Sequence, residues 1–173
     1  MNFRIFTGNK DNKKSPTLSD RTCFFGTIPV ILRDGDDALL PDGLRGVRRL
    51  FRVEGVEGAG KTVIVGAFHS GSQKPGPDAC RGFYLENTSG DVYIGVGGFT
   101  ITGCSTPAFP TAGASSEEAD YAGGAVLANT AKEQLIRSQV YDCVISNNCA
   151  YSCPALFSGW AQRCVIADNR QEA

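Results

Sequence analysis

The sequence predicts an all-β protein in which short parallel strands stack coil upon coil. Three observations lead to this fold class. Short runs rich in Val, Ile, Phe and Tyr recur along the chain, Gly, Asn, Asp, Ser or Pro separates them, and two similar heptapeptides stand 21 positions apart. With 173 residues, 42% of them hydrophobic and 20% charged, the chain has the composition of a folded domain.

Ten runs are expected to be strands, because each is short, β-prone and bounded by turn-forming residues. They are residues 23–32, 49–54, 62–68, 82–86, 92–96, 99–102, 125–128, 141–146, 155–157 and 164–167. Residues 129–140 form the one helix-like stretch, with Leu135 and Ile136 as its apolar pair. Residues 105–122 are polar and are expected to form a surface loop or an insertion.

The repeat is clearest near the C-terminus. Residues 142–148 (DCVISNN) align with residues 163–169 (RCVIADN), and residues 98–104 (GFTITGC) form an earlier copy. Ile101 precedes Ile145 by 44 residues, which we interpret as two coils of about 22, giving roughly six coils in the chain. The 21 glycines are expected at the tight corners between strands.

Stacking of equivalent strands assigns faces to the side chains. Residues of successive coils would lie about 4.8 Å apart, and side chains alternate between the two faces of a strand. The inward set is Phe99, Ile101, Cys143, Ile145, Cys164 and Ile166; the outward set is Thr100, Thr102, Asp142, Val144, Ser146, Arg163, Val165 and Ala167. Asn148 and Asn169 end the strand at equivalent turns, where stacked Asn side chains can hydrogen-bond along the stack.

With these rungs the chain resembles the right-handed parallel β-helix proteins of the pectate-lyase-like superfamily. The matching segments are residues 81–85, 98–103, 123–126, 143–150 and 164–169, and they look like the rungs of large bacterial secreted or surface-displayed proteins. The resemblance implies a solenoid with about 21–30 residues per coil. Residues 1–22 are then a leader or an incomplete first coil, and residues 23–173 the β-helix domain, with its clearest rungs at 81–169.

The resemblance implies an extracellular or cell-surface module that binds a polysaccharide or cell-surface glycan, or serves as a structural stalk. The alternative is a polysaccharide lyase or glycoside hydrolase, whose substrate would lie in the groove of one parallel sheet. On that face we expect Thr100, Thr102, Asp142, Ser146 and Arg163. Lyases of this kind hold Ca²⁺ with surface Asp residues, so Ca²⁺ is expected only for the lyase alternative. The pectate lyase and polygalacturonase signatures are absent from the sequence.

A second alternative comes from residues 55–62 (GVEGAGKT), which fit the phosphate-binding pattern G-x-x-x-x-G-K-[ST]. Gly55 and Gly60 would shape the loop, Lys61 would reach the terminal phosphates, and Thr62 would ligate Mg²⁺. A phosphate-binding loop must open into a helix, however, whereas β-branched residues follow Thr62. We therefore favour a tight turn between two strands.

The seven cysteines and the single histidine limit metal chemistry. The spacing C-x5-C-x3-C-x10-C from Cys143 to Cys164 lacks the paired knuckles of a zinc site, so no metal site is expected. Cys143 should lie directly under Cys164, as stacked thiols or as a disulfide between coils. Cys149 and Cys153 are candidates for a disulfide within a loop.

The net charge of −1 gives no general attraction to nucleic acid, and no apolar run is long enough to span a membrane. No secretory signal is visible at the N-terminus, although the resemblance implies an extracellular or cell-surface location. The last residues follow a rung directly, and solenoids need caps on their end coils. We therefore expect a fragment, with further β-helix rungs of the same parent chain beyond it.

Overall fold

The computed structural model describes residues 30–34, 49–66, 79–87, 92–106, 121–130 and 138–171. Within these ranges the protein is built from β-strands joined by turns, with no α-helix. The prediction of an all-β protein with parallel strands is therefore confirmed for this part of the chain. Residues 1–22 lie outside the described residues.

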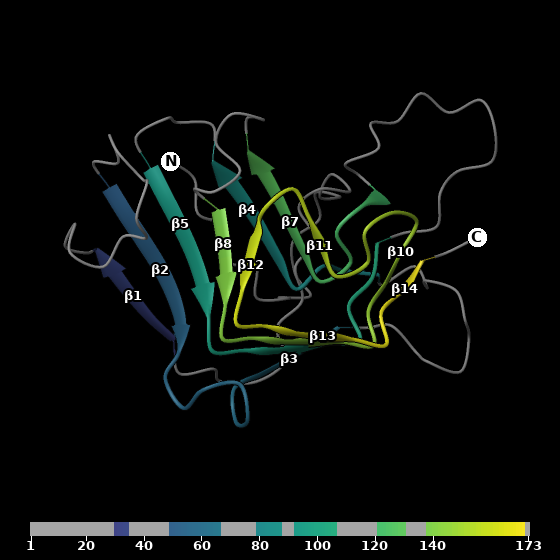
Figure 1. Ribbon diagram of the computed structural model, residues 1–173, viewed down its shortest axis with the longest axis horizontal. Helices are drawn as coiled ribbons and strands as arrows, with labels where there is room; N and C mark the ends of the chain where they lie inside the picture. Colours follow the sequence, from purple (N-terminus) through teal and green to yellow (C-terminus); the bar gives the residue numbers. More distant parts are fainter. Residues whose placement is uncertain are drawn as a thin grey trace, which may run out of the picture.

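The strands form four sheets (Figure 1), and all pairs are parallel except the first, β1 with β2. The five-stranded sheet has the order β1(Val30–Asp34), β2(Arg49–Gly55), β5(Val92–Gly97), β8(Ser138–Tyr141), β12(Trp160–Gln162). The four-stranded sheet has the order β13(Val165–Ala167), β9(Val144–Ser146), β6(Thr100–Thr102), β3(Val63–Val65). The three-stranded sheet joins β11(Leu156–Phe157), β7(Val126–Thr130) and β4(Phe83–Asn87), and the two-stranded sheet joins β10(Cys149–Ala150) and β14(Arg170–Gln171).

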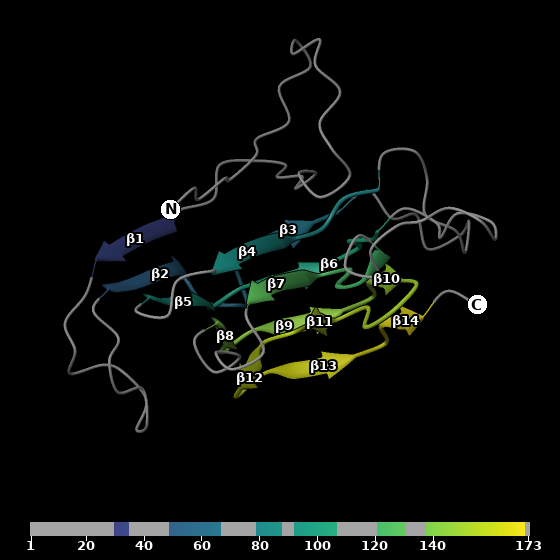
Figure 2. The same cartoon turned by 90° about the horizontal axis from the view of Figure 1, so that it is seen from above.

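The chain visits these sheets repeatedly in one order. It passes from β5 to β6 to β7, from β8 to β9 to β10 and β11, and from β12 to β13 to β14. We call each such pass a coil. Figures 1 and 2 show the coils lying side by side, with the parallel strands of successive coils in neighbouring layers.

The spacing between neighbouring coils corrects the sequence-based coil count. Ile101 pairs directly with Ile145, and the equivalent contact from Cys104 to Asn148 spans 44 residues, so this interval is one coil rather than two. The next step, from Asn148 to Asn169, spans 21 residues. Among the described residues, the largest number of parallel strands in one sheet is four.

The coil that spans 44 residues includes residues 107–120 and 131–137, which lie outside the described residues. On either side of the first range the chain ends meet, because the hydroxyl of Thr106 donates to the carbonyl oxygen of Tyr121 at 3.1 Å.

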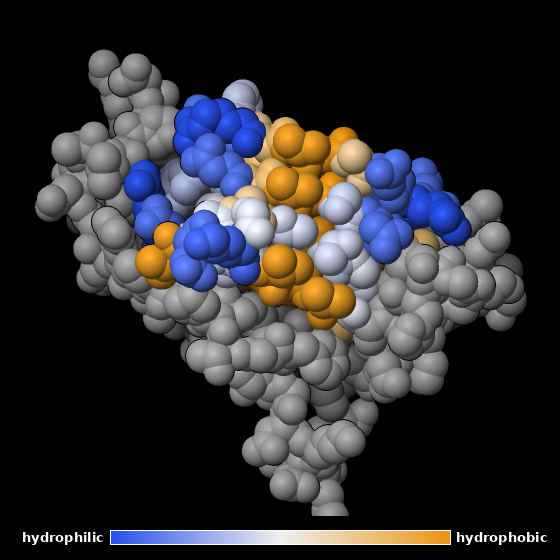
Figure 3. All heavy atoms as spheres, turned by 90° about the horizontal axis from the view of Figure 1, so that it is seen from below, coloured by the Kyte–Doolittle hydropathy of each residue, from blue (hydrophilic) through white to orange (hydrophobic). Residues whose placement is uncertain are grey.

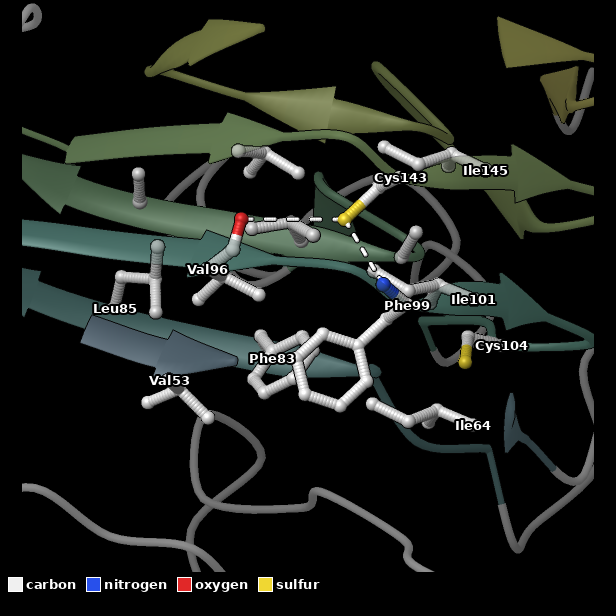
Figure 4. Packing of buried hydrophobic residues seen from close by; sticks show 14 of the residues in the cluster. Val53, Ile64, Phe83, Leu85, Val96, Phe99, Ile101, Cys104, Cys143 and Ile145 are labelled. Carbon is white, nitrogen blue, oxygen red and sulfur yellow. Dashed lines mark hydrogen bonds between the residues drawn. The ribbon is translucent and has the colours of Figure 1, made fainter. Parts of the chain in front are cut away.

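The core lies between the sheets and is made of stacked aliphatic and aromatic side chains (Figure 4). Ile64, Ile101 and Ile145 form a column in consecutive strands of the four-stranded sheet, and each is at most 1% exposed. Phe99 packs edge-on against Phe83, with ring centroids 5.3 Å apart. The large apolar side chains thus repeat at one strand spacing, which favours close packing.

The predicted inward residues Phe99, Ile101, Cys143 and Ile145 are all buried, which confirms their assignment. The equivalent residues of the last coil differ: Cys164 is half-buried, and Ile166 is 50% exposed although it continues the isoleucine column. Ile166 is in register with Ile145, but among the described residues no strand pairs with the outer side of β13.

The expected asparagine stack is present. Asn148 is buried, its Oδ1 accepts from the backbone N–H of Cys104 at 2.9 Å, and its Nδ2 donates to the carbonyl of Ile101 at 3.0 Å and to Oδ1 of Asn169 at 2.8 Å. The Nδ2 of Asn169 donates in turn to the carbonyl of Ile145 at 2.8 Å. The left-handed backbone belongs to the preceding residues, Asn147 and Asp168, with φ of 55° and 54°.

Two local predictions were wrong. The ends of the helix-like stretch 129–140 belong to β7 and β8, and residues 131–137 lie outside the described residues. Pairing of β8 with β5 and β12 decides the conformation there, since weak helix propensity yields to tertiary contacts. Cys149 and Cys153 do not form a disulfide: Cys149 is buried in the stack, and Cys153 is an exposed free thiol.

Candidate functional site

The chain turns sharply where the five-stranded sheet ends and the four-stranded sheet begins. Gly98, Asp142 and Arg163 hold this corner in consecutive coils, with left-handed φ values of 72°, 50° and 51°. The N–H of Gly98 donates to the carbonyl of Tyr141 at 3.2 Å, and the N–H of Asp142 to that of Gln162 at 3.1 Å. The corner therefore stacks with the same backbone geometry in these three coils, whereas the chain passes from β2 to β3 through the turn at residues 55–62.

The side chains of Asp142 and Arg163 form a bidentate ion pair. Nε of Arg163 donates to Oδ1 of Asp142 at 2.7 Å, and a terminal nitrogen donates to Oδ2 at 2.8 Å. This bonding holds the pKa of the Asp142 carboxyl below its usual value, so the group is ionised at neutral pH. Because it is ionised, Asp142 does not offer a proton for general acid catalysis, although each of its oxygens keeps a second acceptor site.

A cavity of about 310 Å³ opens beside this corner. Its walls combine two carboxylates, one phenol, four glycines and a valine: Glu54, Gly55, Val56, Gly58, Gly97, Gly98, Tyr141 and Asp142. The carboxylates of this lining offer strong hydrogen-bond acceptors. The residues come from β2, β5 and β8 and from the turns that follow them, so successive coils build the site together.

Tyr141 is positioned by two features of its neighbours. Its ring occupies the space over Gly97, where a Cβ atom would overlap the ring carbons. Its hydroxyl donates to Oε1 of Glu54 at 2.8 Å, a contact between residues 87 positions apart. Burial and this hydrogen bond raise the pKa of Tyr141 well above its usual range, so the phenol keeps its proton.

A cluster on the outer face of the five-stranded sheet supports the cavity. The guanidinium of Arg52 lies 5.8 Å from the ring centre of Tyr141 and 6.0 Å from that of Tyr93, within the range of cation–π contacts. The hydroxyl of Tyr93 donates to Oε1 of Gln139 at 2.7 Å. Burial raises the pKa of Tyr93 to about 12, although Arg52 opposes the shift.

Glu54, Tyr93 and Tyr141 were not predicted from the sequence to be site residues. Glu54 and Tyr141 come together through strand register, because both are paired with Gly97 across three parallel strands. The glycines at alternate positions of β5, Gly95 and Gly97, mark where the ring lies. Without the register of β8, the sequence does not bring these positions together.

Residues 55–62 form a turn between β2 and β3, as the favoured interpretation predicts. The N–H of Gly58 donates to the carbonyl of Gly55 at 2.9 Å, and the N–H groups of Lys61 and Thr62 donate to the carbonyl of Gly58 at 3.1 and 2.9 Å. Instead of surrounding a phosphate, these N–H groups close the turn, and a strand follows instead of a helix.

The side chains of this turn do not match a nucleotide site either. The ammonium of Lys61 lies 3.8 Å from the carboxylate of Glu57 at the surface, and Thr62 is 3% exposed. Gly60 lies in open space, and Gly55 lines the cavity beside Glu54. Carboxylates around the cavity would repel phosphate, so the phosphate-loop alternative loses its support.

The predicted groove residues Thr100, Thr102 and Ser146 lie on the outward face of the four-stranded sheet. Thr102 pairs with Ser146, and the hydroxyl of Thr100 donates to the carbonyl of Ala59 at 2.6 Å. Figure 3 shows this face as an apolar band flanked by hydrophilic groups, and the exposed valines of this sheet are Val63, Val65 and Val165. Asp142 and Arg163 stand at the corner before this face.

Comparisons with models of protein families, with curated proteins and with solved structures found no match. Across the described ranges, no three His, Cys, Asp or Glu side chains are grouped so that they could hold a metal ion. The same part of the chain contains no helix long and apolar enough to cross a membrane.

Proposed function

We propose that the chain is a right-handed parallel β-helix module of an extracellular or cell-surface protein, and that it binds a neutral glycan at the corner cavity. Support for the architecture comes from the coils, which visit the same sheets in the same order, and from the columns of equivalent residues. Ile64, Ile101, Ile145 and Ile166 stack at one position through four strands. The asparagines stack at another.

The open side of β13 supports a partner in the form of a further coil of the same parent chain. Ile166 is 50% exposed although its alternation points it inward, whereas Ile145 of the same column is buried between β6 and β13. Another parallel coil would pair with β12 and β13 and bury this apolar surface, which stabilises a solenoid.

The observation that carries the glycan proposal is the lining of the cavity. Glu54 and Asp142 offer carboxylate oxygens that accept hydrogen bonds from sugar hydroxyls, and Tyr141 offers an aromatic ring that packs against apolar C–H groups. The volume is at the lower end of the range for small-ligand sites, about 300–1,000 Å³. Because both charged groups of the lining are acidic, the site favours neutral saccharides over uronates.

Isothermal titration of neutral and uronate oligosaccharides tests this proposal. We expect the neutral set alone to bind, with the affinity reduced at least tenfold in Tyr141→Ala and Glu54→Gln. Glu57→Gln is the matched control, because Glu57 is exposed on the adjoining turn and does not line the cavity. Circular dichroism of each variant checks the fold. If no saccharide binds to the folded protein, or if Glu54→Gln and Glu57→Gln behave alike, the glycan site is refuted.

The enzyme alternatives find less support. A lyase or hydrolase needs a base, or a pair of carboxyl groups that change protonation, whereas the acidic and basic groups of the Asp142–Arg163 pair bind each other. Product analysis after incubation with the same oligosaccharides, with and without Ca²⁺, tests this point. Released products that disappear in Asp142→Asn would favour the enzyme.

A further inference from the structure

Two cysteines occupy the same position in neighbouring coils. Cys143 and Cys164 each precede a strand, and the residues after them, Val144 and Val165, are paired. The N–H of Val165 donates to the carbonyl of Cys143 at 2.9 Å, so the two backbones run side by side. At one strand spacing, about 4.8 Å, two Cα atoms fall within the range that a disulfide spans.

The surroundings of the two thiols differ. Cys143 is 1% exposed, and its sulfur accepts from the N–H of Phe99 at 3.5 Å and lies 3.9 Å from the carbonyl of Val96 (Figure 4). Cys164 is half-buried in the last coil, with its sulfur 3.3 Å from the carbonyl of Val140 and 3.4 Å from that of Gln162. A reagent from solvent therefore meets Cys164 first.

The two thiols also differ in acidity. A hydrogen bond from Cys143 lowers the pKa of the Cys164 thiol, whereas that same bond and burial raise the pKa of the Cys143 thiol. The charged neighbours are Asp142, which opposes ionisation of Cys164, and Arg163, whose guanidinium interacts with Cys164. Of the two sulfurs, Cys164 is therefore the one that ionises first and acts as the nucleophile.

We propose that Cys164 and Cys143 form a thiol–disulfide exchange pair, which a small-molecule disulfide oxidises to a bond joining two neighbouring coils. In the first step the Cys164 thiolate attacks one sulfur of the disulfide RSSR, forming a mixed disulfide and releasing RS⁻. In the second step Cys143 loses its proton to water, and its thiolate attacks the Cys164 sulfur and releases the second RS⁻. The two RS⁻ ions take up the protons lost by the cysteines, so two protein thiols and RSSR become one protein disulfide and two RSH.

The first step prepares the second. The principal cause that raises the pKa of Cys143 is its hydrogen bond to Cys164, and the Cys164 sulfur loses its charge when the mixed disulfide forms. Cys143 then ionises more easily, while the N–H of Phe99 is in place to hydrogen-bond its thiolate. The proposed bond lies outside the glycan cavity and is independent of the glycan proposal.

The test treats the folded 173-residue protein with oxidised glutathione, then alkylates and digests it for peptide mass spectrometry. We expect a linked peptide containing Cys143 and Cys164 in the unaltered protein and in the control Cys153→Ser, which lacks an exposed thiol outside the pair. In Cys143→Ser, which keeps a hydrogen-bond donor but no sulfur, the glutathione adduct should stay on Cys164.

A second measurement follows the rate of alkylation of Cys164 with pH. In the unaltered protein the rate should be half-maximal below the ordinary thiol value of about 8.5. In Cys143→Ala, which lacks the donor, this midpoint should rise. Free thiols at both positions after oxidation, a lasting adduct on Cys164 of the unaltered protein, or a disulfide to another cysteine would overturn the proposal.

Discussion

Replacement of Asn148 by Ala tests whether the stacked asparagines hold the coils together. The side chain makes three internal hydrogen bonds, to the N–H of Cys104, the carbonyl of Ile101 and the amide of Asn169, and it is completely buried. Each such bond contributes about 0.5–1.5 kcal/mol, and loss of an acceptor for a buried N–H costs about 1–3 kcal/mol. The truncation should therefore destabilise the protein by about 3–5 kcal/mol.

The matched comparison is Asn169→Ala in the next coil. Asn169 accepts from Asn148 and donates to the carbonyl of Ile145, but it is half-buried at the open end, where water can replace its side chain. Its removal should cost about 1 kcal/mol. Urea unfolding measures both variants, and with a slope of about 2 kcal/mol per molar the midpoints should differ by at least 1 M. Equal midpoints, or a loss below about 1 kcal/mol for Asn148→Ala, would refute the reasoning.

Three further variants or conditions test the core and the cavity. Ile145→Asp places a charge in the apolar column and should cost more than about 4 kcal/mol, measured by urea unfolding; a loss below about 1 kcal/mol would contradict the inward assignment. Gly97→Ala forces the Tyr141 ring aside and should cost about 1–3 kcal/mol and weaken glycan binding, whereas Gly60→Ala, with nothing near its added methyl group, should unfold at nearly the unaltered urea concentration. Because burial raises the folded pKa of Tyr93 from 10.0 to about 12, this residue contributes stability that is present below pH 10 and lost as pH rises through about 12. Urea midpoints at pH 9 and pH 11 measure this loss, and a midpoint that does not fall would contradict it.

The parts of the fold that repeat at short range could be predicted from the sequence. Cys143 to Asn148 and Cys164 to Asn169 differ in few residues and are 21 positions apart, so alternation alone assigned their faces. The interval of 44 residues was misjudged because spacing in the sequence does not distinguish one coil of 44 residues from two coils of 22. Only the pairing of Ile101 with Ile145 distinguishes them.

The cavity could not be predicted because its residues meet only through the register of several coils. Glu54 and Tyr141 are 87 positions apart and come together across Gly97 of the intervening strand. Residues 138–140 of β8 were expected to belong to a helix-like stretch, and Tyr141 to begin the following strand, so no pairing of Tyr141 with β5 was predicted. Burial of Tyr93 likewise depends on side chains from other coils rather than on its own strand.

The backbone of the corner explains the ion pair between Asp142 and Arg163. At this position the coil of β5 and β6 has Gly98, which adopts a left-handed φ without strain, whereas Asp142 and Arg163 adopt the same conformation with a Cβ atom. Their bidentate contact offsets part of this strain at the surface. Arg163→Ala loses the contact and keeps the strain, whereas Arg163→Gly loses both. The urea midpoint of Arg163→Gly should therefore exceed that of Arg163→Ala, and the reverse order would show that the ion pair does not compensate for the backbone of this corner.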